Sequence, residues 1–230
     1  MQRIGIIGGM SWESTQLYYR LINERVRAVK GGLSSAPLLV HSLDFAPVAA
    51  MQAAGDWDGL TALMVNAGLD LKAAGARSLA IATNTMHMMA EQVTERTGLP
   101  LIHIADATAA CVRDMGLIRV ALLATRFTME QAFYRDRLMA AGLSVLVPDE
   151  DDRVEIHRVI YEELCRGIVR DDSRATYTRI MAGLRDRGAQ GVILGCTEIT
   201  LLVRPSDTDL PLFDTTAIHA AAIADQAMAG

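Results

Sequence analysis

The sequence predicts an α/β protein with two pseudo-symmetric lobes, each built on a four-stranded, mainly parallel sheet flanked by helices. Three observations predict this fold class. Short β-branched runs alternate with longer helical patterns along the chain, as in parallel sheets covered by helices. Four such runs lie in each half, and the runs of the two halves resemble one another. The 230 residues are enough for one large or two small domains.

Eight segments are predicted as strands because each is a short apolar or β-branched run. They are Arg3–Ile7, Pro37–His41, Ser78–Ala82, Leu101–Ile104, Arg119–Leu123, Ser144–Val147, Gly191–Leu194 and Leu212–Phe213. Helical patterns lie between them, and the clearest are Ser14–Val29, Trp57–Ala74, Arg153–Arg166 and Ser173–Arg187.

Three strand-forming runs of the first half recur in the second half. The offset is 116 residues between Arg3–Gly9 and Arg119–Thr125. It is 113 residues between Ser78–Thr83 and Gly191–Cys196, and 111 between the runs that begin at Pro100 and Pro211. The offset between matching runs changes only slightly along the chain, and always in the same direction. We therefore interpret the pattern as an ancient duplication.

The duplication predicts how the lobes are divided and where a ligand binds. Lobe 1 is expected to comprise residues 1–98, completed by the C-terminal segment 208–230, and lobe 2 residues 99–207. Ligands of open α/β sheets bind outside the carboxyl ends of the strands. Two facing lobes would therefore share one cleft, in which the equivalent residues Thr83 and Cys196 approach a ligand from opposite sides.

Composition excludes several classes of protein. A net charge of −5 without a cluster of Lys and Arg, and 5% aromatic residues, argue against binding of nucleic acid. No signal peptide and no apolar stretch of about 18 residues is visible, so we expect a cytoplasmic protein without a membrane span. The three cysteines are an odd number and far apart, which predicts free thiols. The five histidines show no metal-ligand spacing, so no metal is expected.

Cys196 is the strongest candidate for chemistry, because it follows a predicted strand and precedes a helix. A helix N-terminus favours the thiolate form, whereas the negative charge of Glu198 raises the thiol pKa. The alternative is a small buried core cysteine, which is the interpretation we favour for Cys111 and Cys165 in their helical patterns. The position at a strand end favours a functional role for Cys196.

Three other strand-end loops are candidates for ligand binding. Thr83-Asn84-Thr85 can turn hydrogen-bond donors toward a carboxylate, although an ordinary helix cap explains the same residues. Gly8-Gly9-Met10-Ser11-Trp12 permits a tight turn and close ligand approach, but it matches neither a dinucleotide fingerprint nor a P-loop. In Thr125-Arg126-Phe127-Thr128 the arginine can hold a carboxylate or simply be solvated.

The sequence resembles the aspartate/glutamate racemase family, and most of all its aspartate racemase branch, over essentially the whole chain. The motifs that carry the resemblance are Gly8-Gly9-Met10-Ser11-Trp12-Glu13-Ser14, Thr83-Asn84-Thr85-Met86-His87, Gly195-Cys196-Thr197-Glu198-Ile199 and Phe213-Asp214-Thr215. The resemblance implies a two-lobed α/β racemase, often a homodimer, that acts on a small amino acid. It also implies that no pyridoxal phosphate or other cofactor is needed, because a cysteine from each lobe flanks the substrate α-carbon.

The resemblance assigns roles to individual residues. Cys196 becomes one acid/base residue, and Thr83 stands in the place of the other cysteine. A threonine hydroxyl does not titrate near neutral pH, so one enantiomer is expected to be handled better than the other. Glu198 also fits the aspartate racemase branch. The implied contacts to the α-carboxylate and amine are Met10, Asn84, Thr85, Thr125, Thr128 and Thr197.

Two positions leave the choice of substrate open. Gln52 and Arg166 correspond to basic residues that hold the side-chain carboxylate in members that act on acidic substrates. Gln52 is neutral, whereas Arg166 can pair with a carboxylate bidentately. Acidic and neutral amino acids therefore both remain candidate substrates.

Two alternatives accompany the racemase hypothesis. The first is a single-cysteine lyase or isomerase of the wider superfamily, similar to arylmalonate decarboxylases or maleate isomerases. The second is an amino-acid-binding protein that lost turnover with its first cysteine. Release of carbon dioxide from a malonate indicates the first alternative, and ligand binding without proton exchange indicates the second.

Overall fold

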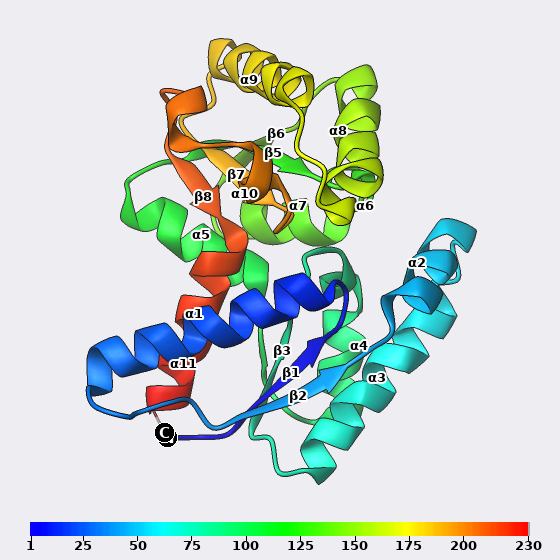
Figure 1. Cartoon of the computed structure of the whole chain (residues 1–230), viewed down its shortest axis with the longest axis vertical. Helices are drawn as coiled ribbons and strands as arrows, with labels where there is room; N and C mark the ends of the chain where they lie inside the picture. The colour runs from blue at the N-terminus through cyan, green and yellow to red at the C-terminus, as the bar shows by residue number, and fades with distance from the viewer. Residues whose placement is uncertain (230) are drawn as a thin grey trace. The chain divides into compact units, whose positions relative to one another are not determined.

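The computed structural model describes residues 1–229 and divides into two compact units. Unit 1 comprises Met1–His103 together with the C-terminal segment from His219, and unit 2 comprises Ile104–Ile218. Each unit contains one four-stranded sheet in which all the strand pairs are parallel (Figure 1). The predicted fold class is therefore confirmed.

The sheet of unit 1 has the strand order β2-β1-β3-β4. Its strands are β1 (Ile4–Gly8), β2 (Leu38–Ser42), β3 (Ser78–Ile81) and β4 (Leu101–Ile102). The helical segments of this unit are α1 (Trp12–Lys30), α2 (Phe45–Ala54), α3 (Trp57–Ala73), the 3₁₀ helix η1 (Thr85–Met89), α4 (Ala90–Thr97) and most of α11 (Thr215–Ala229).

Both faces of the central strands β1 and β3 are buried, as is usual for parallel sheets. Ile4 and Ile6 of β1 pack in a cluster with α1 and α11, on the face where Tyr18 and Ile223 are buried. Ile7 belongs to a second cluster with α2, α3 and α4, formed on the other face. Alternate residues of β1 thus pack against opposite helix layers, because successive side chains of a strand point to opposite faces.

The sheet of unit 2 has the equivalent order β6-β5-β7-β8. Its strands are β5 (Arg119–Ala124), β6 (Ser144–Leu146), β7 (Val192–Gly195) and β8 (Leu212–Asp214). The helical segments of this unit are α5 (Ile104–Asp114), α6 (Arg126–Glu130), α7 (Ala132–Ala140), α8 (Glu150–Glu162), η2 (Leu164–Arg166), α9 (Asp171–Asp186), α10 (Ile199–Leu202) and η3 (Pro205–Asp207). The first residues of α11 also belong to this unit.

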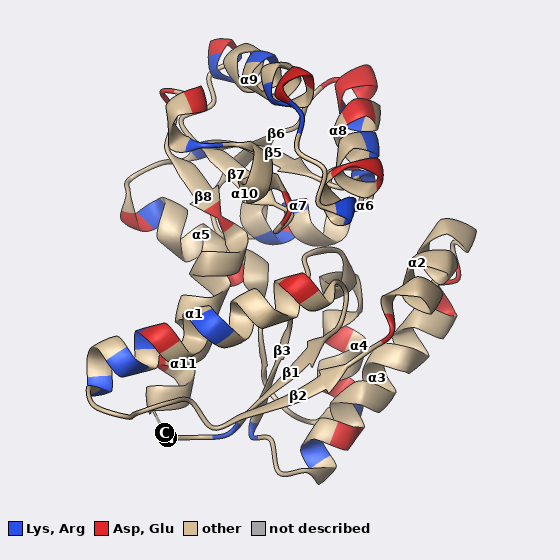
Figure 2. Ribbon diagram, in the orientation of Figure 1, with Lys and Arg blue, Asp and Glu red and all other residues tan. Residues whose placement is uncertain are grey.

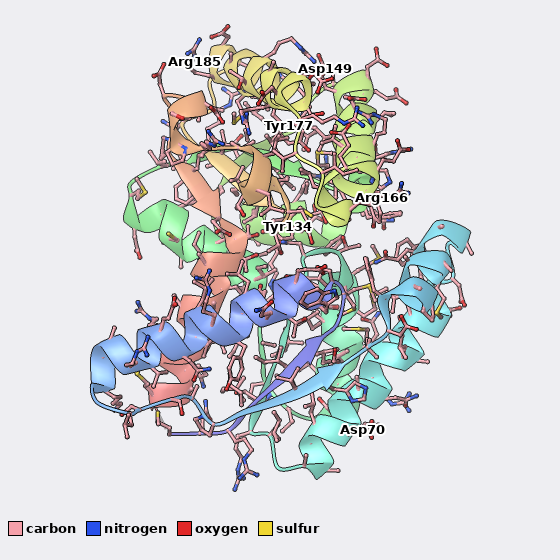
Figure 3. All side chains as sticks on the ribbon, in the orientation of Figure 1. Asp70, Tyr134, Asp149, Arg166, Tyr177 and Arg185 are labelled. Carbon is pink, nitrogen blue, oxygen red and sulfur yellow. The ribbon has the colours of Figure 1, made fainter. Side chains whose placement is uncertain are left out.

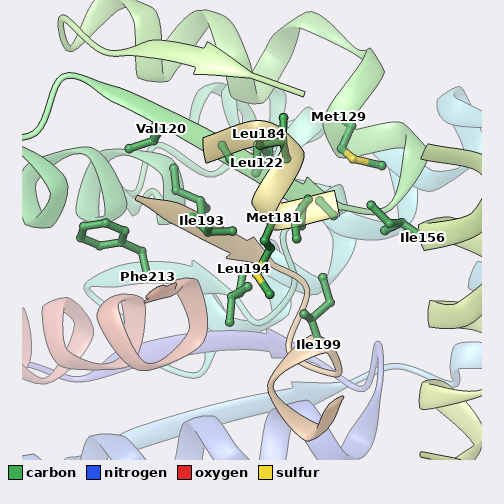
Figure 4. Close-up of a cluster of buried hydrophobic side chains, with 14 of the residues drawn as sticks. Val120, Leu122, Met129, Ile156, Met181, Leu184, Ile193, Leu194, Ile199 and Phe213 are labelled. Carbon is green, nitrogen blue, oxygen red and sulfur yellow. The ribbon is translucent and has the colours of Figure 1, made fainter. Parts of the chain in front are cut away.

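One continuous apolar core holds unit 2 together. Val120 and Leu122 of β5, Ile193 of β7, and Met181 and Leu184 of α9 lie in this cluster (Figure 4). All five are buried to within a few per cent of complete burial. Burial of a side chain of this size contributes roughly 1.5–3 kcal/mol, so this cluster dominates the stability of the unit.

The observed elements match the predicted strands but differ from the expected domain boundaries. All eight predicted strands are present. Unit 1 extends to His103 because β4 pairs with β3. The C-terminal contribution to unit 1 begins at His219 instead of residue 208, because β8 pairs with β7 of the second sheet.

The predicted helix Arg153–Arg166 is the element that differs most from its expected form. The observed α8 starts at Glu150 and ends at Glu162, and the separate 3₁₀ helix η2 follows. Its first turn contains Glu150, Asp151 and Asp152, whose negative charges favour a helix N-terminus.

Charged side chains of both signs alternate on the outer helices (Figure 2). Arg25 on α1 forms a bidentate ion pair with Asp225 on α11, with N–O distances of 2.8 and 2.7 Å. Both side chains are about half exposed, so the pair contributes little to stability.

A buried polar chain attaches α11 to the first sheet. His219 is fully buried, and its Nε2 lies 2.8 Å from the carbonyl oxygen of Ile102 at the end of β4. A carbonyl only accepts, so Nε2 carries the proton. In the neutral ring Nδ1 then accepts from the Tyr18 hydroxyl, at 2.9 Å. Burial lowers the pKa of His219 to about 4, which keeps this ring neutral.

This histidine predicts a specific loss of stability in acid. Its folded pKa lies below the ordinary value of about 6.5, so the unfolded chain binds the proton first as the pH falls. The free energy of unfolding should therefore fall by about 2 kcal/mol between pH 7.5 and pH 5 through this group alone. Urea unfolding of wild type and His219→Gln at both pH values measures how far the free energy of unfolding falls in each protein. Equal pH dependence of the two proteins would contradict it.

Candidate functional site

The strand orders place the candidate site at the carboxyl ends of the central strands in each unit. In unit 1 the chain order reverses between β1 and β3, and in unit 2 between β5 and β7. Open α/β sheets bind ligands at such switch points, outside the carboxyl ends of the strands. The candidate residues therefore lie in the loops that follow β1, β3, β5 and β7.

The turn after β1 requires glycine at residue 9. Gly9 has a φ of +84°, and a Cβ there would lie 2.1 Å from the carbonyl oxygen of Leu43. Its N–H donates to Thr15 Oγ1 at 2.8 Å. Ser11 then caps α1, because its hydroxyl accepts from the N–H of Ser14 at 3.3 Å. Backbone geometry and capping together fix the chain at this strand end.

The segment after β3 contains Thr83, Asn84 and Thr85. Thr83 is partly buried, while Asn84 and Thr85 are almost fully buried. His87 makes two hydrogen bonds within this loop. Its backbone N–H donates to the Asn84 carbonyl at 3.1 Å, and its ring Nδ1 lies 2.8 Å from the Thr83 carbonyl oxygen. The loop leads directly into η1.

Two further residues predicted for the site lie at this end of unit 1. Met10 follows the β1 turn and is buried in the same apolar cluster as Met86 of η1. Gln52 on α2 is also buried, and its Nε2 donates to Met86 Sδ at 3.3 Å. The structure therefore brings the predicted residues of unit 1 together around the ends of β1 and β3.

The loop after β5 presents two buried threonines. Thr125 and Thr128 have their hydroxyl oxygens 3.4 Å apart, and the N–H of Thr128 donates to the Thr125 carbonyl at 3.0 Å. Arg126 between them is about half exposed, and its Nε lies 3.3 Å from Glu130 Oε1. Arg126 thus pairs with a carboxylate of its own unit, an arrangement that neither sequence interpretation included.

Cys196 stands directly after β7, and its thiol donates to Glu198 Oε2 at 2.9 Å. Burial raises the pKa of the Cys196 thiol well above its usual range, and the charge of Glu198 raises it further. The helix that follows, α10, is only one turn long. The thiolate-favouring helix expected from the sequence is thus outweighed, and Cys196 is a thiol at neutral pH.

The first turn of α11 holds the loop after β7 in place. Thr215 Oγ1 donates to the Leu194 carbonyl at 2.8 Å, and the hydroxyls of Thr216 and Thr197 are 3.1 Å apart. Asp214 caps the helix by accepting from the N–H of Thr216 at 2.9 Å. Phe213-Asp214-Thr215 therefore has a structural role next to the cysteine loop.

Side chains that the sequence did not single out surround the thiol of unit 2. Burial raises the pKa of the Tyr161 and Tyr177 hydroxyls, and an ionised Cys196 would raise both further, as an ionised Cys165 would at Tyr161. Both tyrosines therefore stay neutral, and Tyr177 lies inside the unit (Figure 3). Arg166 follows Cys165 in η2 and is exposed. No local sequence signal marks these helix residues, because only tertiary packing brings them close to Cys196.

Residues 1–229 contain neither a candidate metal cluster nor a candidate membrane span. In this part of the chain, no group of three or more His, Cys, Asp or Glu side chains is placed to hold a metal ion. No helix in the same range is long and apolar enough to cross a membrane.

Comparison with known proteins now identifies the family. The family model described as Asp/Glu/Hydantoin racemase matches residues 7–223. The chain belongs to this family. The resemblance deduced from the sequence motifs is therefore confirmed, and the family supports a racemase-like activity.

Solved structures agree with this assignment. A Yersinia pestis protein assigned as an Asp/Glu racemase is 51% identical, covers 99% of this chain and 100% of its own, and superposes with a TM-score of 0.94. An aspartate racemase homologue from Pyrococcus horikoshii OT3 is 33% identical with the same coverage and a TM-score of 0.84. Glutamate racemase from Francisella tularensis is 14% identical over 99% of this chain and 81% of its own, with a TM-score of 0.66, and shows the shared fold.

The β1 turn predicts a selective effect of a single methyl group. Gly9→Ala should destabilise the protein by roughly 1–3 kcal/mol or more, since it combines positive φ with a backbone clash. Gly55→Ala is the matched control, because Gly55 has a φ of +72° but nothing within 4 Å of the added Cβ. Chemical unfolding compares the two variants. A loss no larger in Gly9→Ala than in Gly55→Ala would rule out the clash.

The Cys196–Glu198 contact predicts the reactivity of the thiol. Glu198→Gln removes the negative charge, so the thiol pKa should fall and alkylation of Cys196 by iodoacetamide at pH 7.5 should accelerate. The expected factor is roughly tenfold for each unit by which the pKa falls. Peptide mass spectrometry follows the rate, and Cys111 in the same digest is the internal control. An unchanged or slower rate at Cys196 would contradict the assigned protonation state.

Proposed function

We propose that this protein racemises a small amino acid without pyridoxal phosphate, moving the α-proton with Cys196 and Thr83. The observation that carries the proposal is the Cys196 thiol, hydrogen-bonded to Glu198 at the end of a central strand. Thr83 follows the equivalent central strand of unit 1. In the proposed mechanism the two side chains act on opposite faces of the substrate α-carbon.

The thiol–carboxylate pair supports acid/base work by Cys196. In the resting state the thiol carries the proton and can donate it to a carbanion at the α-carbon. In the reverse direction Glu198 Oε2 accepts the thiol proton, and the thiolate then removes the α-proton. Glu198 thus serves as the proton acceptor for Cys196, whose high pKa keeps the thiol protonated and so unable to act as a base in the resting state.

Thr83 makes the proposed reaction asymmetric. Its hydroxyl can donate a proton to the opposite face of the carbanion, but it is a poor base near neutral pH. Positioned proton transfer is typically worth about 10²–10⁴ in rate. The enantiomer whose α-proton faces Cys196 should therefore exchange that proton with solvent much faster than its mirror image, whereas kcat/KM for inversion is the same from either enantiomer.

The remaining strand-end residues are proposed to bind the substrate. The α-carboxylate and amine would be held by Met10, Asn84, Thr85, Thr125, Thr128 and Thr197. Gln52 and Arg166 would face the substrate side chain. An exposed guanidinium suits a carboxylate and a buried amide suits a neutral or acidic group, so aspartate, glutamate and neutral amino acids are all candidates.

One observation also favours a second activity. A single protonated cysteine, with threonine at the equivalent position of unit 1, suits a decarboxylase that protonates one face of an enediolate. The substrate would be a substituted malonate, and carbon dioxide would be released. A racemase leaves the carbon count of its substrate unchanged, so the two activities are readily distinguished.

Chiral chromatography tests the proposal directly. Metal-free and pyridoxal-free protein is incubated with each enantiomer of aspartate, glutamate and several neutral amino acids. We expect inversion by wild type and by Cys111→Ala, and a loss of at least about 10³-fold in Cys196→Ala. Equal turnover by Cys196→Ala would contradict the proposal. Tight ligand binding without turnover in wild type would indicate a binding protein. Release of carbon dioxide from a malonate would indicate a decarboxylase.

The role of Thr83 has its own test. A thiol at this position can both donate and accept the α-proton, so Thr83→Cys should increase inversion of both enantiomers, and α-proton exchange from the slowly exchanging one, by about tenfold or more. Thr83→Ser keeps a hydroxyl and is the matched control. A folded Thr83→Cys variant without any gain would show that Thr83 does not act at the α-carbon.

A homodimer is a prediction from the family resemblance, and a cytoplasmic location is a prediction from the sequence itself. Sedimentation equilibrium at several protein concentrations checks the first, and fractionation of the source cells checks the second.

A further inference from the structure

His87 makes a hydrogen bond that determines its own tautomer. Its side chain is 2% exposed, and Nδ1 lies 2.8 Å from the Thr83 carbonyl oxygen. A carbonyl oxygen can only accept, so Nδ1 must carry a proton. The ring therefore donates to the backbone of the residue whose hydroxyl is proposed to act on the substrate.

Two other histidines fix the orientation of this ring. The His103 ring has its centroid 4.5 Å from that of His87, and the His219 ring meets it edge-on at 5.5 Å. His219 is itself held between the Tyr18 hydroxyl and the Ile102 carbonyl. Residues from α1, β4 and α11 thus keep His87 in one position.

Thr83 depends on this contact because regular strand pairing ends just before it. The N–H of Ala82 donates to the Ile7 carbonyl at 2.9 Å, and β3 has already ended at Ile81. The Thr83 carbonyl instead accepts from His87, four residues further along the chain. Its backbone orientation, and with it the direction of the Thr83 hydroxyl, is therefore set by an imidazole.

We propose that His87 is a positioning residue that aims the Thr83 hydroxyl by holding the Thr83 carbonyl through Nδ1. This inference rests on the proposed racemase function and deepens it. A misplacement of about 1 Å at a reacting group can cost about 10²-fold in rate. Loss of this hydrogen bond should therefore impair the Thr83 half of the reaction and spare the Cys196 half.

Two substitutions separate the hydrogen bond from simple packing. The amide nitrogen of asparagine falls near the position of Nδ1, whereas that of glutamine falls near Nε2. His87→Asn should therefore keep the bond to Thr83, and His87→Gln should lose it although it is closer to histidine in volume. Thermal unfolding of both variants shows whether they remain folded.

The ratio of α-proton exchange to inversion is the decisive readout. In D₂O, exchange without inversion needs only Cys196, whereas inversion needs Thr83 as well. NMR follows loss of the α-proton, and chiral chromatography follows inversion, starting from the enantiomer that exchanges faster. We expect His87→Gln to lower inversion relative to exchange by about tenfold or more, and His87→Asn to remain near wild type.

Each outcome has a distinct meaning. An unchanged ratio in His87→Gln, or an equal fall in both variants, would overturn the role of the Nδ1 bond. If wild type shows neither exchange nor inversion, the proposed function itself fails. If both variants unfold, NMR of ¹⁵N-histidine-labelled wild type decides: a protonated Nδ1 on His87 supports the proposal, and an unprotonated Nδ1 overturns it.

Discussion

The constraint on which the structure depends is the parallel pairing of each sheet, with two central strands whose carboxyl ends stay open. In both units the order places the first and third strands next to each other. Their helices cover opposite faces, so the chain leaves the two strand ends in divergent directions, and open α/β sheets bind their ligands outside such strand ends. Apolar packing on both faces holds the strands in place, and the residues just beyond the strand ends are held in position by them.

Burial and charge together determine what Cys196 can do. A partly buried thiol beside a carboxylate holds its proton, so it is first a donor and becomes a base only when Glu198 takes that proton. In unit 1 a hydroxyl occupies the equivalent place, and a hydrogen bond from the His87 side chain to the Thr83 carbonyl defines its loop. The duplicated fold thus carries two chemically different strand ends, which is the physical basis for an asymmetric reaction.

Much of the fold could be predicted from the sequence, because buried parallel strands are short, apolar and repeated in both halves. Thr83 and Cys196 were found for the same reason, since each follows such a strand. Helix α2 was not recognised, because its residues are apolar almost all round and show no periodicity, although it carries Gln52. Tyr161, Tyr177 and Cys165 lie on distant helices and approach Cys196 only through packing. The protonation state of Cys196 also required the structure, because burial decides between opposing influences that the sequence left open.

The most direct test of the central claim is a crystal structure of the protein with bound aspartate, or with a neutral amino acid if that is the better substrate. The account predicts that Cys196 Sγ and Thr83 Oγ1 lie on opposite faces of the α-carbon, each at about 3–3.5 Å, the distance expected of reacting groups. A ligand whose α-carbon contacts only one of these side chains, or neither, would contradict it.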